Sequence, residues 1–310
     1  MTTSRTAATA APSTWLTWEV VPRGVSEIFF QSNTWTGLLI LAAFVVADWQ
    51  MALLALIGAI CSTLAGVLMR VKTDDITMGM AGFNGTLVGA ALFVELGGGK
   101  VWTYVLTVVG ALVCGPVTWF FNWLFATPAL SRFGLPSTTA PFCSVTGVIY
   151  VLTTSLHVES SSHHAFDESA GSLLRSLLTN VSEVVLINNV WSGALILVGL
   201  FVASWKVGLA AAMGSVIGTL CALAMGESAE TIVEGLAGYS GVLTAIALSV
   251  VFLRSTVGSW IYAAVGAAIT AVVTVAMTDA YGGPHFTWPY ILTTWVLLVI
   301  ATFIPALKRP

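Results

Sequence analysis

The sequence contains two copies of one segment, and this duplication constrains the fold more than any other feature. When the chain is shifted by 156 positions, residues 25–92 align with residues 181–248 without a gap, and 26 of the 68 pairs are identical. The identities include residues that shared composition alone would not align, namely Asn33, Trp35, Gly37 and Trp49 with Asn189, Trp191, Gly193 and Trp205. A fixed internal period indicates a structural repeat.

Each copy consists mainly of hydrophobic spans. Apolar residues make up 57% of the chain and charged residues only 8%, whereas soluble domains carry about a quarter charged residues. A helix needs roughly 20 apolar residues to cross a bilayer. We therefore expect an all-α polytopic membrane protein. Five spans are expected in each copy, near 25–47, 50–69, 78–96, 101–125 and 141–156 and near 181–203, 206–225, 231–252, 257–278 and 288–306.

An odd number of spans predicts that the second copy enters the membrane upside down, as in many transport proteins. With a cytoplasmic N-terminus, nine of the 11 Lys and Arg residues face the cytoplasm and only Lys100 and Arg175 lie outside, which fits the positive-inside rule. Both termini are then cytoplasmic. The predicted order is a tail (1–22), repeat 1 (23–156), a polar linker (157–178), repeat 2 (179–306) and a tail (307–310).

Two related segments rich in proline and hydroxyl groups interrupt the hydrophobic pattern. Residues 134–142 and 282–290 share a Pro, a Thr three residues later, and then a Pro and an aromatic residue. Proline starts or breaks a helix, and broken backbone at membrane depth is tolerated where protein buries it or water reaches it. We expect two half-helices that aim these motifs at a central pore. The alternative is a tight loop at the membrane surface.

Two carboxylates, Glu27 and Glu183, occupy equivalent positions near the start of the copies. Each could cap a helix or pair with a neighbour such as Arg23, but carboxylates inside a membrane usually mark a pathway. We expect them at opposite ends of a pore. The glycine-rich stretches 79–85 and 235–241 permit close backbone approach or a helix break, although glycine also packs membrane helices without any pore.

The first of the two proline-containing segments resembles the signature of a known family. The segment from Leu135 to Phe142 has the sequence LPSTTAPF. It looks like the LPxxTxPF signature of the urea transporter family, and the resemblance is to bacterial members. This resemblance covers nearly the whole chain and implies ten transmembrane helices plus two pore half-helices in two inverted five-span repeats. It further implies a homotrimer of independent pores, a selective passive channel for urea, and a multi-pass protein of the bacterial inner membrane.

Site residues follow from the same resemblance. Glu27 and Glu183 match polar pore-mouth residues that accept hydrogen bonds from urea, and Thr139 and Thr287 match mid-pore threonines. Apolar residues that flatten the pore into a slot match Phe30, Phe83, Leu87, Val184 and Leu243. The chain departs from the family where Gln is common at the mouth and Glu stands here, and where the second motif begins Gly283-Pro284 and ends in Tyr290.

The sequence also allows other functions. The channel could conduct ammonia, water or a short amide, although the four histidines lie in the linker or near Pro284 and no Asn-Pro-Ala pair occurs. A proton-coupled transporter would use Glu27 or Glu183 as the carrier. We expect no enzyme, cofactor, metal or nucleic-acid partner, because no phosphate-binding loop or zinc spacing occurs and the four cysteines sit in apolar runs.

Overall fold

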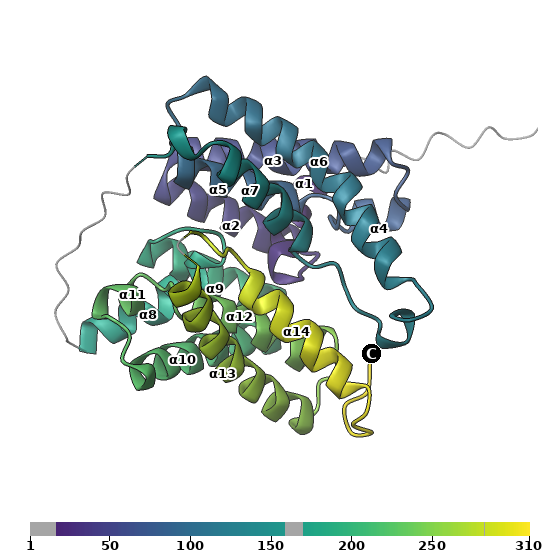
Figure 1. Ribbon diagram of the computed structural model, residues 1–310, viewed down its shortest axis with the longest axis vertical. Helices are drawn as coiled ribbons and strands as arrows, with labels where there is room; N and C mark the ends of the chain where they lie inside the picture. The colour runs from purple at the N-terminus through teal and green to yellow at the C-terminus, as the bar shows by residue number, and fades with distance from the viewer. Residues whose placement is uncertain (1–16, 159–169, 282) are drawn as a thin grey trace, which may run out of the picture.

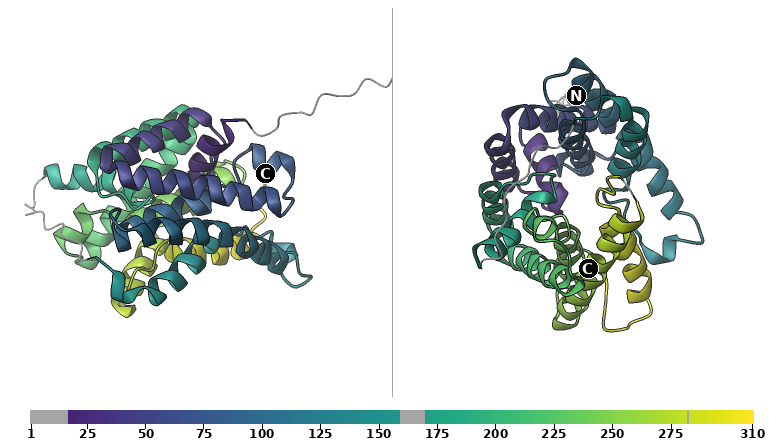
Figure 2. Two further views of the ribbon diagram at one scale, coloured as in Figure 1. Left: turned by 90° about the horizontal axis from the view of Figure 1, so that it is seen from above. Right: turned by 60° about the vertical axis from the view of Figure 1, so that its left-hand side comes forward.

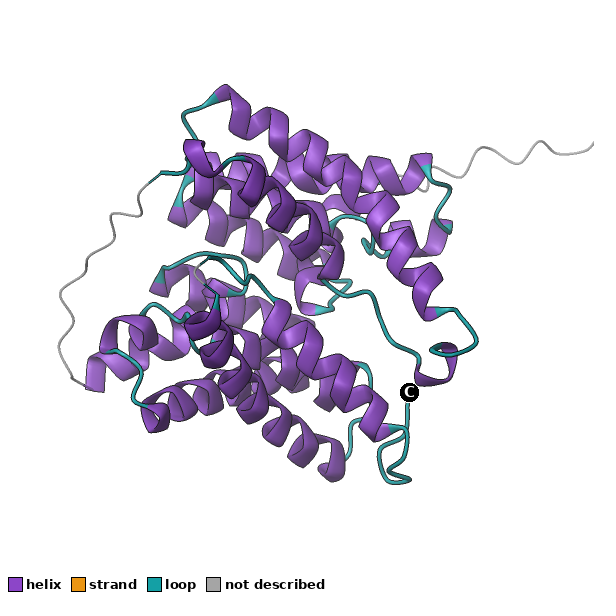
Figure 3. Cartoon of the chain, viewed as in Figure 1, coloured by secondary structure: helices purple, strands orange, loops and turns teal. Residues whose placement is uncertain are grey.

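The computed structural model describes residues 17–158, 170–281 and 283–310. Most of the expected N-terminal tail, and the linker residues 159–169 with His163 and His164, lie outside the described residues. The described residues form helices joined by loops and contain no strand (Figure 3). This agrees with the expected all-α polytopic class.

Over residues 17–158 the first half is built from seven α-helices and three short 3-10 turns. In chain order they are α1 (Val20–Ser26), η1 (Glu27–Phe29), α2 (Thr34–Ala47), α3 (Trp49–Leu68), α4 (Thr73–Thr77), α5 (Phe83–Leu96), α6 (Val101–Phe125), η2 (Ser131–Phe133), α7 (Ala140–Leu152) and η3 (Thr154–Leu156).

The second half repeats this order and lies beside the first (Figures 1 and 2). Its elements are α8 (Ala170–Glu183), α9 (Val190–Ala203), α10 (Trp205–Met225), α11 (Ala229–Val233), α12 (Tyr239–Ile246), the π-helical turn η4 (Ala247–Val251), α13 (Val257–Ala280) and α14 (Trp288–Ala301). Helix α8 begins at Ala170, inside the stretch 157–178 that the sequence predicts as a linker. Within this helix the hydroxyl groups of Ser176 and Thr179 donate to carbonyls of the preceding turn, Ser176 to Leu173 at 2.7 Å and Thr179 to Arg175 at 3.2 Å.

Four helices in the described chain are long and apolar enough to cross a membrane, namely α3, α6, α10 and α13. The expected span 25–47 is broken instead of continuous, because α1 with η1 and α2 meet at an angle of 80°. The break follows Phe30, which has a φ of 61° in the left-handed region. A hydropathy pattern reports apolar content and not backbone direction, so it predicts the two helices as one continuous span.

The other apolar helices are shorter. Helices α5, α7 and α14 have 13 or 14 residues, about 21 Å at 1.5 Å per residue, which is less than the roughly 30 Å hydrocarbon core. Ten of the 14 residues of α5 and every residue of α12 are buried. Short helices of this kind end inside the protein, where their ends can face a central site.

Glycines allow α5 and α12 to approach the neighbouring long helices closely. A Cβ atom at Gly58 would lie 1.9 Å from the Gly85 carbonyl oxygen, and one at Gly214 would lie 2.5 Å from the Gly241 carbonyl oxygen. Gly58 and Gly214 are equivalent positions of the two copies, as are Gly85 and Gly241. The glycine-rich motifs therefore allow close helix packing, which is one of the interpretations that the sequence allowed.

The backbone repeats between the halves even where the residues differ. Left-handed φ angles occur at Phe30 and Leu186, both 61°, and at Thr138 and Phe286, 45° and 44°. Each pair occupies equivalent positions of the two copies. Such conformations are uncommon for residues other than glycine, so their recurrence reflects the same local fold in both halves.

Helices α2 and α9 cross between the halves and exchange equivalent hydrogen bonds. The Thr36 hydroxyl donates to the Gly199 carbonyl at 2.8 Å, and the Ser192 hydroxyl donates to the Ala43 carbonyl at 2.8 Å. Thr36 corresponds to Ser192 and Ala43 corresponds to Gly199. This reciprocal pattern is what a twofold relation produces, and the order of the contacts makes the two helices antiparallel.

Candidate functional site

The two Pro–Thr–Pro motifs meet at the interface between the halves. Thr139 and Thr287 are the N-cap residues of α7 and α14, and a proline follows in the first turn of each helix. An N-cap threonine usually accepts a hydrogen bond from its own helix, but neither of these does. Their hydroxyl oxygens lie 2.6 Å from each other. The two side chains are 3% exposed, so the pair forms a buried polar contact.

The first turn of α7 leaves few backbone donors for a ligand. The amide of Ala140 donates to the Ser137 carbonyl at 3.1 Å, the amide of Phe142 donates to Asn84 Oδ1 at 3.1 Å, and Pro141 has no amide hydrogen. The groups near the threonine pair that remain available are therefore mainly hydroxyl and carbonyl oxygens. These can accept hydrogen bonds from N–H groups.

Side chains from the glycine-rich motifs hold the segments that precede the threonines. Asn84 Nδ2 donates to the Thr138 carbonyl at 3.4 Å, and the Tyr239 hydroxyl donates to the Phe286 carbonyl. Thr138 and Phe286 are equivalent residues, but Asn84 and Tyr239 are not. The sequence did not assign Asn84 to the site, and only its place in a repeated motif next to Gly85 could have drawn attention to it.

Cys143 is a further member of the threonine cluster. Its Sγ lies 3.1 Å from Thr287 Oγ1 and its side chain is fully buried. The equivalent residue in the second half is Ile291, so the cluster is asymmetric. The sequence shows Cys143 only as one of four cysteines in apolar runs, and nothing in its spacing predicts a contact with a residue 144 positions away.

Glu27 faces a cavity of about 400 Å³ on one side of the threonine pair. Phe30, Phe83, Thr138 and Phe252 also line it, and most of its wall is apolar. The rings of Phe30 and Phe252 pack edge to face with centroids 5.5 Å apart. Glu27, Phe30 and Phe83, three of the residues expected at the pore, therefore lie at one cavity that reaches Thr138, the neighbour of Thr139.

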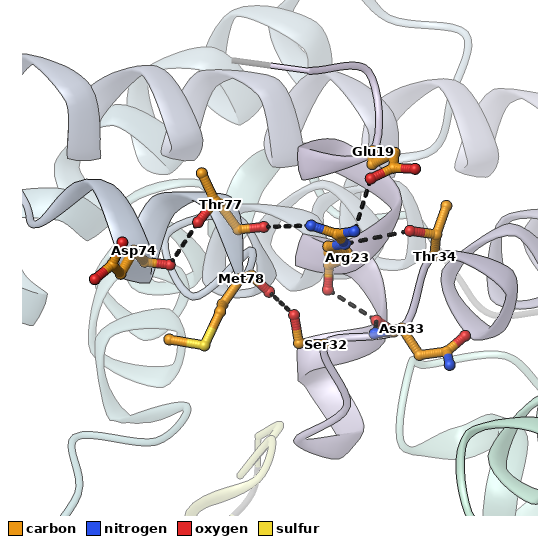
Figure 4. Close-up of polar contacts among 9 residues, drawn as sticks. Glu19, Arg23, Ser32, Asn33, Thr34, Asp74, Thr77 and Met78 are labelled. Atoms are coloured by element: carbon orange, nitrogen blue, oxygen red, sulfur yellow. Dashed lines mark hydrogen bonds and ion pairs between the residues drawn. The ribbon is translucent and has the colours of Figure 1, made fainter. Parts of the chain in front are cut away.

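Arg23 does not pair with Glu27, although the sequence allowed this pairing. Its Nη2 instead lies 2.7 Å from Glu19 Oε2, while its Nη1 donates to the Thr77 carbonyl and its Nε to the Thr34 hydroxyl, each at 3.2 Å (Figure 4). Arg23 thus joins α1 to α2 and α4 at the bend. This leaves the half-buried Glu27 carboxylate without the guanidinium and turned to the cavity.

Glu183 ends α8 at the position equivalent to Glu27 and is also half-buried. It lies close enough to Glu234 and Tyr239 to interact with them electrostatically. Tyr239 in turn contacts the segment before Thr287 through Phe286. The two glutamates are therefore each linked to one of the two motifs, Glu27 through its cavity and Glu183 through Tyr239.

The other expected apolar residues are deeply buried. Leu87 and Leu243 are fully buried and Val184 is 1% exposed. All three belong to the same apolar cluster that packs against Phe30 and Phe83. Within the described residues, no group of three or more His, Cys, Asp and Glu side chains is placed to hold a metal ion. What the site offers chemically is a buried pair of hydroxyl groups and a thiol, with apolar residues around them.

Comparisons with known proteins agree over most of the chain. A family model described as "Urea transporter" matches residues 18–302. A protein named Urea transporter 1 from Ovis aries is 31% identical over an alignment of 305 residues, which covers 93% of this chain and 78% of that protein. A protein of the same name from Rattus norvegicus is 30% identical over 298 residues, with the same shares covered.

Proposed function

The chain belongs to the urea transporter family, and from this premise we propose that it is a passive channel for urea whose narrowest part lies at Thr139 and Thr287. The observation that carries the proposal is the contact between their hydroxyl oxygens, 2.6 Å apart. They come from equivalent motifs 148 positions apart, at the N-termini of two short helices.

The chemistry of the cluster suits urea. Urea is flat and neutral, with four N–H donors and one carbonyl acceptor, and removing its water without replacement costs several kcal/mol. Threonine hydroxyls both donate and accept hydrogen bonds, so Thr139 and Thr287 can replace part of that water. Apolar neighbours such as Leu87 and Leu243 offer nothing to a hydrated ion. The site therefore favours a small neutral amide over charged solutes.

We propose that the path runs from the Glu27 cavity past the threonine pair to Glu183. The position of Glu27 at a cavity that includes Thr138 supports the first part of this path. The link from Glu183 through Tyr239 to Phe286 supports the second part. Under this proposal Phe30, Phe83, Leu87, Val184 and Leu243 form the apolar walls, and each carboxylate accepts hydrogen bonds from urea at one mouth.

The arrangement in the membrane is proposed as well. The antiparallel crossing of α2 and α9 and their exchanged hydrogen bonds support two inverted five-span repeats. The Lys and Arg distribution supports cytoplasmic termini, and family resemblance supports three copies per assembly in a bacterial inner membrane. Protease accessibility of tags at both termini in inside-out vesicles tests the orientation. Light scattering coupled to gel filtration tests the trimer.

The central experiment is osmotic. Purified protein in liposomes is exposed to an inward urea gradient, and the vesicle reswelling that accompanies urea entry is followed by light scattering, with glycerol gradients and protein-free vesicles as controls. Faster urea entry that saturates weakly and does not respond to voltage is expected. Urea permeability equal to that of protein-free vesicles would contradict the proposal.

Two alternatives give different results in the same vesicles. A proton-coupled transporter would show urea flux that changes with an imposed pH gradient. A channel for water or ammonia would pass these solutes faster than urea. The cluster of two hydroxyl groups and a thiol contains no carboxylate at its centre, and this observation favours the passive channel over proton coupling.

A further inference from the structure

A second pocket lies away from the threonine pair, where the C-terminal segment meets the loop after α6. Figure 1 shows the C-terminal end beside this loop, and Arg309 Nη2 donates a hydrogen bond to the Phe133 carbonyl. The pocket has a volume of about 390 Å³. It is formed by residues 131–134 on one side and by residues from α14 to Arg309 on the other.

The pocket carries a concentrated positive charge. Arg132, Lys308 and Arg309 line it, and no aspartate or glutamate occurs among the described residues of its lining. Arg132 and Lys308 are exposed, and neither has an ion-pair partner in the described part of the chain. Arg132 rests over the Phe133 ring at 4.6 Å. Two cationic side chains are thus held near each other without an anion to neutralise them.

Arg309 has a different role from the other two cations. Besides Phe133, its guanidinium contacts the Phe252 carbonyl at 3.5 Å, and its own carbonyl accepts a hydrogen bond from Arg254 at 3.0 Å. Arg309 therefore fixes the shape of the pocket by joining the two halves. The groups that remain free to bind a ligand are Arg132 and Lys308.

The surroundings place this charge at a membrane boundary. The pocket follows the C-terminal ends of the long apolar helix α6 and of α14. Phe303 is 71% exposed and Ile304 is 36% exposed beside it. Cationic side chains bind phosphate oxygens, and Lys and Arg clusters next to membrane helices recognise anionic lipid head groups. A soluble anion would use the charges but not the exposed apolar side chains.

We propose that this pocket binds the phosphate of an anionic phospholipid, with Arg132 and Lys308 as the contacting cations and the acyl chains along Phe303 and Ile304. The bound lipid bridges the loop after α6 and the C-terminal segment, and thereby strengthens the contact between the two halves that Arg309 begins.

Native mass spectrometry of the detergent-purified full chain tests this proposal. Phosphatidylglycerol is titrated onto the wild type, the double variant Arg132→Gln/Lys308→Gln and each single variant. The matched control is Arg70→Gln/Lys72→Gln, which removes two exposed positive charges elsewhere. Phosphatidylcholine with the same acyl chains and inorganic phosphate form two further arms. Thermal melts without lipid confirm that every variant is folded.

We expect phosphatidylglycerol affinity to fall about fivefold for each charge removed from the pocket and to stay unchanged in the control. Phosphatidylcholine should bind much more weakly than phosphatidylglycerol. Equal phosphatidylglycerol affinity for the wild type and the double variant would overturn the proposal. So would equal binding of phosphatidylcholine, or displacement of the lipid by inorganic phosphate at similar concentration, which would identify a soluble anion as the occupant.

Discussion

Replacing Thr139 by Val tests the threonine pair most directly. The change keeps the side-chain shape and removes one hydroxyl, which is 3% exposed and bonded at 2.6 Å to Thr287. In the variant the Thr287 hydroxyl keeps a contact with Cys143 at 3.1 Å. The variant should therefore fold, and its main defect should be one missing hydrogen-bond partner for the solute.

The size of this defect follows from the burial of the site. A buried polar group that loses its partner costs about 1–3 kcal/mol. With about 1.4 kcal/mol for each tenfold change in rate, urea permeation should slow by about 5-fold to 150-fold. Thr287→Val should slow urea permeation more than Thr139→Val, because it leaves the Thr139 hydroxyl without its partner. The double variant should be less than additive, since the two hydroxyls bond each other.

Stopped-flow light scattering of proteoliposomes measures the effect at matched protein content. Thr107→Val is the matched control, because Thr107 is equally buried and its hydroxyl bonds the Thr103 carbonyl of its own helix at 2.8 Å. The control should conduct urea like the wild type. If Thr139→Val and Thr287→Val both conduct urea within about twofold of the wild type, the threonine pair does not contact the solute and the reasoning is refuted.

Three further outcomes are expected. Cys143→Val should slow urea permeation by about threefold because Thr287 loses a partner, whereas Cys143→Ser should restore it; equal rates for the two variants would deny the thiol a polar role. Tyr239→Phe should lower the melting temperature in detergent, since the Phe286 carbonyl loses its buried donor. The free energy of unfolding should fall by about 1–3 kcal/mol, and an unchanged melting curve would contradict this. Gly85→Ala should lower the free energy of unfolding by about 1–3 kcal/mol, because its Cβ would lie 2.1 Å from the Gly58 carbonyl oxygen. Gly147→Ala is the control and should melt like the wild type, because no neighbouring atom lies within 4 Å of a Cβ there.

Much of the site was accessible from the sequence because the duplication pairs its residues. Thr139 and Thr287 share a motif, and a repeat that meets its own copy about a twofold axis brings equivalent residues together. Glu27 was expected at a pore mouth for the same reason, and it lies at a cavity with Phe30 and Phe83. The roles in conduction of all nine predicted residues stay predictions, namely Glu27, Glu183, Thr139, Thr287, Phe30, Phe83, Leu87, Val184 and Leu243.

Other structural features could not be predicted from the internal repeat or from hydropathy. The 80° bend between α1 and α2 depends on backbone angles at Phe30, and hydropathy records only that the flanking residues are apolar. The contact of Cys143 with Thr287 has no counterpart at Ile291, so the symmetry of the copies gave no sign of it. Arg23 forms its ion pair with Glu19 and not with Glu27, a choice that the sequence does not decide.

The sequence by itself determined that the chain spans a membrane, that it is built twice from one plan, and that two threonines and two glutamates are equivalent. Composition and register are properties of the chain, so they can be read without coordinates. Only the tertiary structure decided which equivalent residues touch. It brought Thr139 and Thr287 to 2.6 Å, turned Arg23 away from Glu27, and added Asn84, Tyr239 and Cys143 to the site. The physical reason is that these contacts join residues far apart in the chain, and their partners are selected by helix packing and by the need to satisfy buried polar groups.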